Sequence, residues 1–164
     1  MNTRYTKIDS PLGDLLVARD DEGITALYLP HGKKPARPAA DWVRDDDAFD
    51  DVRTQLGEYF AGERTSFDLP LHMLGSAFQK RVWTGLLGIP CGETTSYGAL
   101  ANVIGAPGAA RAVGLANGQN PISIIVPCHR VIGADGSLTG YGGGLPAKQW
   151  LLTHEQRQSE LFAV

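Results

Sequence analysis

The stretch SYGALANVIGAPGAARAVGLANG, residues 96–118, decides the fold of the second half of the chain. Ser96 can cap a helix over residues 97–104, because a serine oxygen accepts a hydrogen bond from the free N–H groups of a first helical turn. Two glycines in residues 105–108 then break that helix, and a second helix is predicted over residues 109–118. Helix, tight turn and helix are the outline of a helix-turn-helix, although many helical hairpins share it.

Helices and glycine-bearing turns continue on both sides of this stretch. Ser76 can cap a helix that ends at Gly88, with an apolar face repeating every four residues. Downstream, ISIIV at residues 122–126 reads as a strand, and the glycine-rich segment SLTGYGGGLP leads into a last helix from about Leu145, with Pro146 near its start. We therefore expect a mostly helical domain over residues 75–164.

The first part of the chain has a different texture. Three strand-like runs in residues 3–30 are separated by turn-type clusters at residues 10–13 and 20–23, which predicts an antiparallel meander. Residues 30–47 read as a loop, and the apolar spacing from Val52 to Phe60 predicts a helix from about Asp47. The predicted fold class is α+β, with an antiparallel sheet plus a helix in residues 1–74 and the helix-turn-helix domain after it.

Composition narrows the class of protein. The chain has 164 residues, of which 43% are hydrophobic, and two cysteines, too few for a disulfide framework. It has no signal-peptide pattern and no apolar run long enough to span a bilayer, so we expect a cytoplasmic protein with no membrane association. Residues 1–72 carry a net charge of −5 and residues 73–164 one of +2, which favours the second half as the part that meets a polyanion.

Chemistry is concentrated in IIVPCHRVIG, residues 124–133. An arbitrary cysteine after an apolar run is usually packing. Here, however, Pro127 would end the predicted strand just before Cys128, and the adjacent His129 and Arg130 would lower the thiol pKa from about 8.5 toward neutrality. These neighbours favour a nucleophile, although neighbours in sequence need not touch.

A nucleophilic thiol needs a base, and a base needs an orienting group. His129 is the nearest candidate base. Glu155 shares a helix face with Lys148 and two leucines, so it is either a local partner of Lys148 or a partner of His129. Cys91 lies in a turn with no base nearby and is read as structural or exposed. No cluster of Cys and His has zinc spacing, so no metal is expected.

The helix over residues 109–118 combines Arg111 with alanines and glycines. Small residues usually indicate close helix packing, and an arginine on a helix is usually solvated. The alternative is a face that lets the backbone approach DNA closely while one arginine reaches in. Tyr97, at the start of the preceding helix, is open to the same two interpretations, core or DNA contact.

Taken together, these motifs resemble the O6-alkylguanine-DNA alkyltransferases. The resemblance covers essentially the whole chain and is strongest from Phe78 to Glu155. The blocks that carry it, in the family order, are FQKRVW, IPCGETTSYGALA, GAARAVGLANGQNPISIIVPCHRVIGADGSLTGYGGG and KQWLLTHE. The PCHRV motif is highly specific, and here it follows NP and precedes GYGGG.

The resemblance implies roles for particular residues. Cys128 matches the alkyl acceptor, His129 a base that works through a bridging water, and Glu155 the acid that orients it. Asn120 matches an asparagine that braces the site, and Arg111 the finger that fills the gap in the duplex. The remaining implied roles are guanine and phosphate contact for Tyr97, close DNA approach for Ala109, Ala110, Ala112 and Gly114, and the guanine pocket for Val131, Tyr141, Gly142, Gly143 and Lys148.

The resemblance also implies a function. It is irreversible, single-turnover transfer of an alkyl group from O6-alkylguanine, with O4-alkylthymine left open, in duplex DNA to Cys128, without a cofactor. The nucleotide is flipped out of the helix first. A monomer is expected, with cooperative assembly on DNA left open. Two alternatives remain at this point: a non-catalytic helix-turn-helix module that senses alkylated DNA, and a cysteine hydrolase using Cys128 and His129.

Overall fold

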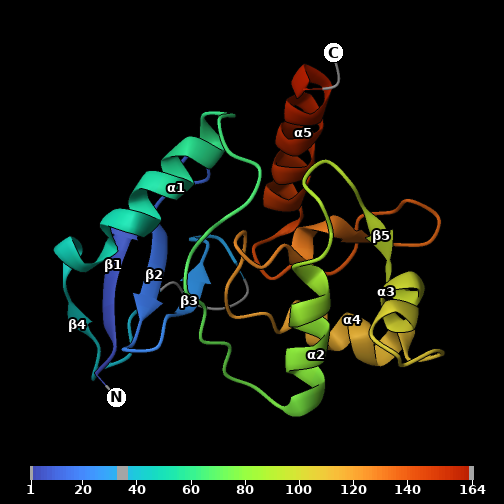
Figure 1. The fold of residues 1–164 in the computed structure, drawn as a ribbon, viewed down its shortest axis with the longest axis horizontal. Coiled ribbons are helices and arrows are strands. Elements are labelled where there is room, and N and C mark those ends of the chain that lie inside the picture. Colours follow the sequence, from blue (N-terminus) through green and yellow to red (C-terminus); the bar gives the residue numbers. More distant parts are fainter. Residues whose placement is uncertain (1, 33–36, 163–164) are drawn as a thin grey trace.

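The first half of the chain is built on a four-stranded sheet. The structure, a computed structural model, describes residues 2–32 and 37–162. Strands β1 (Arg4–Ile8), β2 (Leu15–Arg19) and β3 (Ile24–Tyr28) pair in antiparallel fashion, and β4 (Val43–Arg44) adds to β1 in parallel, giving the order β3-β2-β1-β4. Helix α1 (Asp50–Phe60) packs on this sheet (Figure 1). The sheet is therefore mixed, where the sequence predicted a purely antiparallel one.

The segment predicted as a loop, residues 30–47, contains part of the regular structure. Strand β4 forms because Val43 N–H donates to the Thr3 carbonyl and Asp45 N–H donates to the Tyr5 carbonyl. A 3₁₀ turn, η1 (Asp46–Phe49), then leads into α1. A two-residue strand has no periodicity from which it could be predicted. Part of the predicted loop, residues 33–36, lies outside the described residues.

The second half is mostly helical, as predicted. It contains α2 (Ala77–Leu86), α3 (Tyr97–Val103), α4 (Ala110–Gly118) and the long α5 (Leu145–Phe162), with a small parallel pair formed by β5 (Thr95–Ser96) and β6 (Val131–Ile132). Ser76 caps α2 in a capping box with Gln79, and Ser96 caps α3. The turn between α3 and α4 needs its glycines, since Gly105 and Gly108 have φ of 77° and 83°.

The prediction of a strand at residues 122–126 is wrong. These residues are all buried but form a compact turn in which Val126 N–H donates to the Ile122 carbonyl and Ile124 takes a φ of 72°. Only an isolated bridge joins Leu27 to Ile122 in the described chain. A short buried apolar run looks the same in a strand and in a buried turn, so periodicity could not separate the two.

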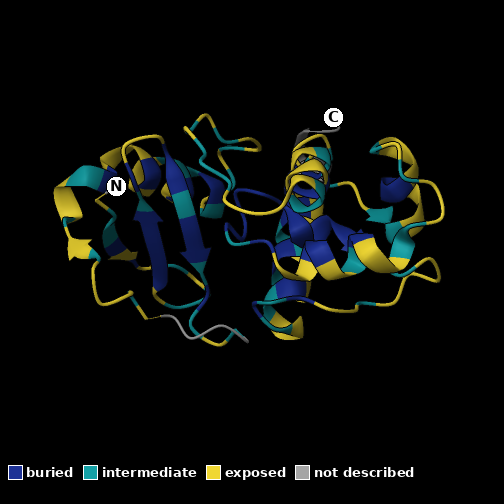
Figure 2. Cartoon of the chain, turned by 90° about the horizontal axis from the view of Figure 1, so that it is seen from below, coloured by how far each residue is buried: buried dark blue, intermediate teal, exposed yellow. Residues whose placement is uncertain are grey.

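The two halves share one hydrophobic core. It contains Leu27 and Tyr59 from the first half and Ile124 and Leu151 from the second, and Figure 2 shows buried residues in both halves of the chain. The predicted α+β fold class is confirmed, whereas the division between residues 74 and 75 stays a prediction. In the described residues, no helix is both long and apolar enough to span a membrane.

Candidate functional site

The thiol of Cys128 lies at the start of a 3₁₀ turn, η2 (Cys128–Arg130), which follows the compact turn and leads directly into β6. Its residue is only 3% exposed. The sequence predicted that Pro127 ends a strand just before Cys128. In the structure, Pro127 follows a buried turn, so there is no strand for it to end. Instead, the buried turn before it and the β5–β6 pair after it fix the position of the sulfur.

Two asparagines hold this turn. Asn120 Nδ2 donates to the Val126 carbonyl at 2.8 Å, and Asn120 Oδ1 accepts from Ile122 N–H at 3.0 Å. Asn117 Nδ2 donates to the carbonyl of Cys128 itself at 3.3 Å. The sequence singled out Asn120 but not Asn117, which lies among small residues of α4 and has no motif of its own.

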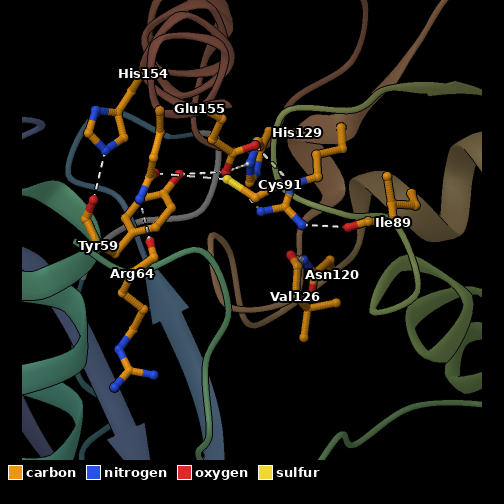
Figure 3. A network of polar contacts seen from close by, with 11 residues as sticks. Tyr59, Arg64, Ile89, Cys91, Asn120, Val126, His129, His154 and Glu155 are labelled. Carbon is orange, nitrogen blue, oxygen red and sulfur yellow. Dashed lines mark hydrogen bonds and ion pairs between the residues drawn. The ribbon is translucent and has the colours of Figure 1, made fainter. Parts of the chain in front are cut away.

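Glu155 is the centre of a buried polar network (Figure 3). Its Oε2 lies 2.8 Å from His129 Nε2, and its two oxygens accept from Arg130 Nε at 2.8 Å and Arg130 Nη2 at 3.0 Å. Of the two interpretations offered by the sequence, the contact between His129 and Glu155 is present. Lys148 instead donates to two backbone carbonyls.

The sequence did not place two members of this network in it. Arg130, expected beside the thiol, instead hydrogen-bonds to Glu155, and its Nη1 donates to the Ile89 carbonyl at 2.6 Å. Tyr59, from α1 in the first half, donates its hydroxyl proton to Glu155 Oε2 at 2.6 Å. Tyr59 falls within the apolar spacing that predicts its helix, and nothing in the sequence shows which distant helix it meets.

The pKa shifts follow from burial and from this network. Burial raises the pKa of Cys128 to about 11, although Asn120 and Lys148 act to lower it. The expectation of a thiol pKa near neutrality is wrong for this structure, because the His129 and Arg130 side chains turn toward Glu155. Burial also lowers the pKa of His129. Burial would raise the pKa of Glu155, but the charges of its neighbours and the hydrogen bonds from His129 and Arg130 outweigh burial. They hold the pKa of Glu155 far below its usual range.

The implied pocket residues gather beside the thiol turn. Lys148 Nζ lies 2.7 Å from the carbonyl oxygens of Val131 and Thr139, which ties α5 to β6 and to the glycine-rich loop. The Tyr141 ring meets the His129 ring edge to face at 6.4 Å. Of the implied pocket residues, Gly142 and Gly143 line a cavity of about 210 Å³, whereas Val131, Tyr141 and Lys148 do not. Its walls come from both halves of the chain: Tyr28, Leu29, Gly32, Gly118, Asn120, Ser123, Gly142 and Gly143.

The helix-turn-helix residues lie on a more open face. Arg111 and Ala112 are exposed, while Ala109, Ala110 and Gly114 are partly exposed. The Tyr97 hydroxyl lies 3.1 Å from Thr139 Oγ1, and a Cβ at Gly114 would lie 3.5 Å from the Tyr97 ring. Tyr97 is thus neither fully buried core nor free: it joins α3 to the glycine-rich loop.

Cys91 lies at the edge of the network, where Glu155 and Arg130 both act on its thiol. It lines a cavity of about 460 Å³ between the halves of the chain, together with Phe67, Leu69 and Arg130. Its sulfur is 4.0 Å from Gln158 Oε1, and burial raises its pKa to about 11. Among the described residues, no cluster of three or more His, Cys, Asp or Glu side chains could hold a metal ion.

A buried cysteine, a histidine–glutamate pair that begins at the next residue, and a helix-turn-helix on an α+β scaffold agree with the class that the sequence resembles, DNA alkyltransferases. Two family models match the chain, the 6-O-methylguanine DNA methyltransferase ribonuclease-like domain over residues 3–73 and the DNA-binding domain of the same family over residues 77–157. The chain belongs to the 6-O-methylguanine DNA methyltransferase family.

Individual relatives agree with the family models. A methylated-DNA–protein-cysteine methyltransferase of Mycolicibacterium paratuberculosis is 56% identical over 94% of this chain and 93% of its own length. One from Methanosarcina acetivorans is 51% identical over 92% and 97%. The crystal structure of Mycobacterium tuberculosis OGT in complex with DNA matches with a TM-score of 0.88 at 52% identity, over 96% of this chain and 94% of that one.

Proposed function

We propose that this chain repairs DNA by moving the alkyl group of O6-alkylguanine in a duplex onto Cys128, once per molecule. The observation that carries the proposal is the buried pair of His129 Nε2 and Glu155 Oε2, 2.8 Å apart, on the residue next to the thiol. A cysteine that only fills the core needs no buried histidine whose ring is oriented by a carboxylate. We also propose that residues 1–74 and 75–164 are the two domains, with the site on the second.

The histidine pair fixes the direction of proton transfer. Glu155 is ionised, so it accepts hydrogen bonds only, and His129 Nε2 must carry the proton that points at it. The lone pair of the neutral ring is then on Nδ1, which is buried and has no partner among the described residues. We propose that Nδ1 takes the Cys128 proton through a bridging water, while Glu155 stabilises the imidazolium that forms.

Burial favours the protonated thiol at Cys128, and this suits a single-use nucleophile. With a pKa of about 11, Cys128 is a thiol at neutral pH and stays protected from chance electrophiles. We propose that the thiolate forms only when a flipped base fills the site. Its sulfur then attacks the alkyl carbon, the carbon–O6 bond breaks, and guanine leaves as an anion that takes a proton from the Tyr97 hydroxyl.

Recognition of DNA is assigned to the helix-turn-helix. Arg111 is exposed at the first turn of α4, and the small residues around it leave room for a close backbone approach. We propose that Arg111 enters the duplex when the damaged nucleotide leaves it. Flipping costs a few kcal/mol, which phosphate contacts and the inserted arginine offset. The cavity at Asn120 and the loop of Gly142 and Gly143 receive the base.

The experiment is mass spectrometry of the chain after incubation with excess duplex containing O6-methylguanine. We expect a gain of one methyl group per molecule, located on the peptide that contains Cys128. Cys91→Ser, which removes the other thiol, should gain the same mass, and Cys128→Ser should gain none. Turnover beyond one equivalent contradicts the single-use mechanism, and tight binding without mass gain favours a damage sensor. A second duplex with O4-methylthymine measures whether that lesion is a substrate.

A further inference from the structure

Helix α1 of the first half reaches the buried network of the second half through Tyr59. Its side chain is fully buried, and its hydroxyl oxygen lies 2.6 Å from Glu155 Oε2, the shortest contact that this carboxylate makes in the described chain. Figure 3 shows Tyr59 and His129 approaching Glu155 from different parts of the chain. The carboxylate beside the candidate base therefore receives a donor from the sheet-bearing half of the molecule.

The described residues make four hydrogen bonds to Glu155, shared unequally between its oxygens. Within this set, Oε1 accepts only from Arg130 Nε. Oε2 accepts from Tyr59, from His129 Nε2 and from Arg130 Nη2. Tyr59 and His129 thus compete for the same oxygen. Since a hydrogen bond to a charged acceptor draws on its negative charge, the phenol weakens the pull of Glu155 on the histidine N–H.

The phenol can act only as a donor at this place. Burial and the charge of Glu155 raise the pKa of Tyr59 well above its usual value, so the hydroxyl keeps its proton. Around His129, the other titratable or charged groups are Glu155 and Lys148 on α5, Arg130 and Cys128 on η2, and Tyr141 on the glycine-rich loop. Cys91 adds to the groups that face Glu155 and Arg130.

We propose that Tyr59 is a positioning residue for alkyl transfer, which acts through Glu155 to keep the His129 imidazole neutral and ready to accept the Cys128 proton. This inference rests on the proposed function. Glu155 without the phenol would hold the His129 proton more strongly and favour the imidazolium before the thiol has given up its proton. The sheet-bearing half would then tune the base as well as support the fold.

A purely structural role is the alternative, because Tyr59 also belongs to the contact between α1 and α5. His154 Nε2 lies 2.7 Å from the Tyr59 carbonyl oxygen, Gln158 Nε2 donates to the Arg64 carbonyl at 3.0 Å, and the Phe60 and Trp150 rings are 5.7 Å apart. Changes to this contact loosen the packing of the two halves without touching the oxygen of Glu155. The two roles can therefore be separated by experiment.

The experiment compares Tyr59→Phe with the unaltered chain in two measurements. An NMR titration of the His129 ring in the free protein, assigned by its loss in His129→Gln, should show a pKa about half to one unit higher in Tyr59→Phe. The acid limb of the pH profile for methyl transfer should move to higher pH by the same amount. Placing 3-fluorotyrosine at position 59, a stronger donor, should move both in the opposite direction, and it keeps the test open if Tyr59→Phe folds poorly.

Two control variants sharpen the result. Phe60→Leu weakens the packing of α1 against α5, and Tyr5→Phe removes a hydroxyl far from the site, where the ring packs against Trp42. Neither should move the His129 pKa or the pH profile. Equal shifts in Tyr59→Phe and Phe60→Leu, or no shift with Phe or fluorotyrosine at position 59, would overturn the proposal. Because the titration uses free protein, its result stands even if methyl transfer itself is not observed.

Discussion

The two thiols of this chain have the same acidity and different surroundings. Cys128 and Cys91 both have a pKa raised to about 11 by burial. Cys91 lies close to the ion pair of Arg130 and Glu155, and Cys128 lies two residues before Arg130 in the chain. Yet Cys128 lies next to His129 in a turn that Asn120 holds, whereas Cys91 lines a cavity with both apolar and polar walls and lies 4.0 Å from Gln158 Oε1. A nucleophile is therefore marked by the proton acceptor beside it, and its own pKa does not distinguish it.

The largest expected effect comes from removing the negative charge of Glu155, which holds the histidine next to Cys128. In Glu155→Gln, His129 loses the anion that stabilises its protonated form, so we expect methyl transfer to slow by about 100-fold. Loss of one partner from a buried ion pair also costs roughly 3–5 kcal/mol of stability, here at Arg130. Single-turnover kinetics on an O6-methylguanine duplex and urea unfolding measure the two effects. The charge of Glu155 also helps to raise the pKa of Cys91, so Glu155→Gln should make Cys91 more reactive toward iodoacetamide while it slows methyl transfer to Cys128, and the two thiols should change in opposite directions.

A smaller effect is expected from loosening the turn that carries Cys128. Asn120→Ala leaves the Val126 carbonyl and the Ile122 N–H without their side-chain partner, at a cost of about 1–3 kcal/mol. The thiol would be held less accurately, so we expect methyl transfer about tenfold slower, because misplacement of a reacting atom by an ångström is costly. Gln119→Ala, on an exposed neighbouring residue, is the matched control. Equal rates in the two variants would remove Asn120 from the proposed site.

Lowering the pH should reduce the stability of the fold through Glu155 and His129, because the pKa of each is lower in the folded chain than in the unfolded one. The pKa of Glu155 is lower in the folded chain than its unfolded value of 4.5, and that of His129 is lower than its unfolded value of 6.5. Below each unfolded value the unfolded chain binds the proton first, so stability falls as pH falls from about 6.5 and falls faster below about 4.5. Each such proton contributes at most about 1.4 kcal/mol per pH unit. Urea unfolding at pH 7, 5.5 and 4 tests this, and Glu155→Gln should flatten the lower part.

The sequence predicted much of this site and missed the parts that depend on distant contacts. The α+β class and the helices between residues 76 and 118 follow from serine caps, glycines and helical spacing. Spacing put Glu155 on an apolar helix face but left its partner open between Lys148 and His129, and the structure has the contact with His129. The prediction of a strand at residues 122–126 was wrong, because a buried turn needs the same run of apolar residues as a buried strand. Tyr59 and Arg130 could not be assigned, since their partners are 96 and 25 residues away in the chain. The predicted thiol pKa was wrong because burial raises it and because His129 and Arg130 pair with Glu155, a carboxylate that only the fold brings near.

The smallest expected effect is a difference in the rates at which Cys91 and Cys128 react with iodoacetamide, a reagent that needs no active site. Iodoacetamide reacts with thiolates, so both cysteines should react faster as pH rises toward about 11. Cys91 is partly exposed and Cys128 is buried, so Cys91 should be modified severalfold faster at every pH in the free protein. Peptide mass spectrometry over a time course in Cys128→Ser, Cys91→Ser and the unaltered chain measures the ratio. Faster modification of Cys128 near neutral pH would mean that its thiolate already exists before DNA binds, and the proposed protection of the nucleophile by burial would have to be given up.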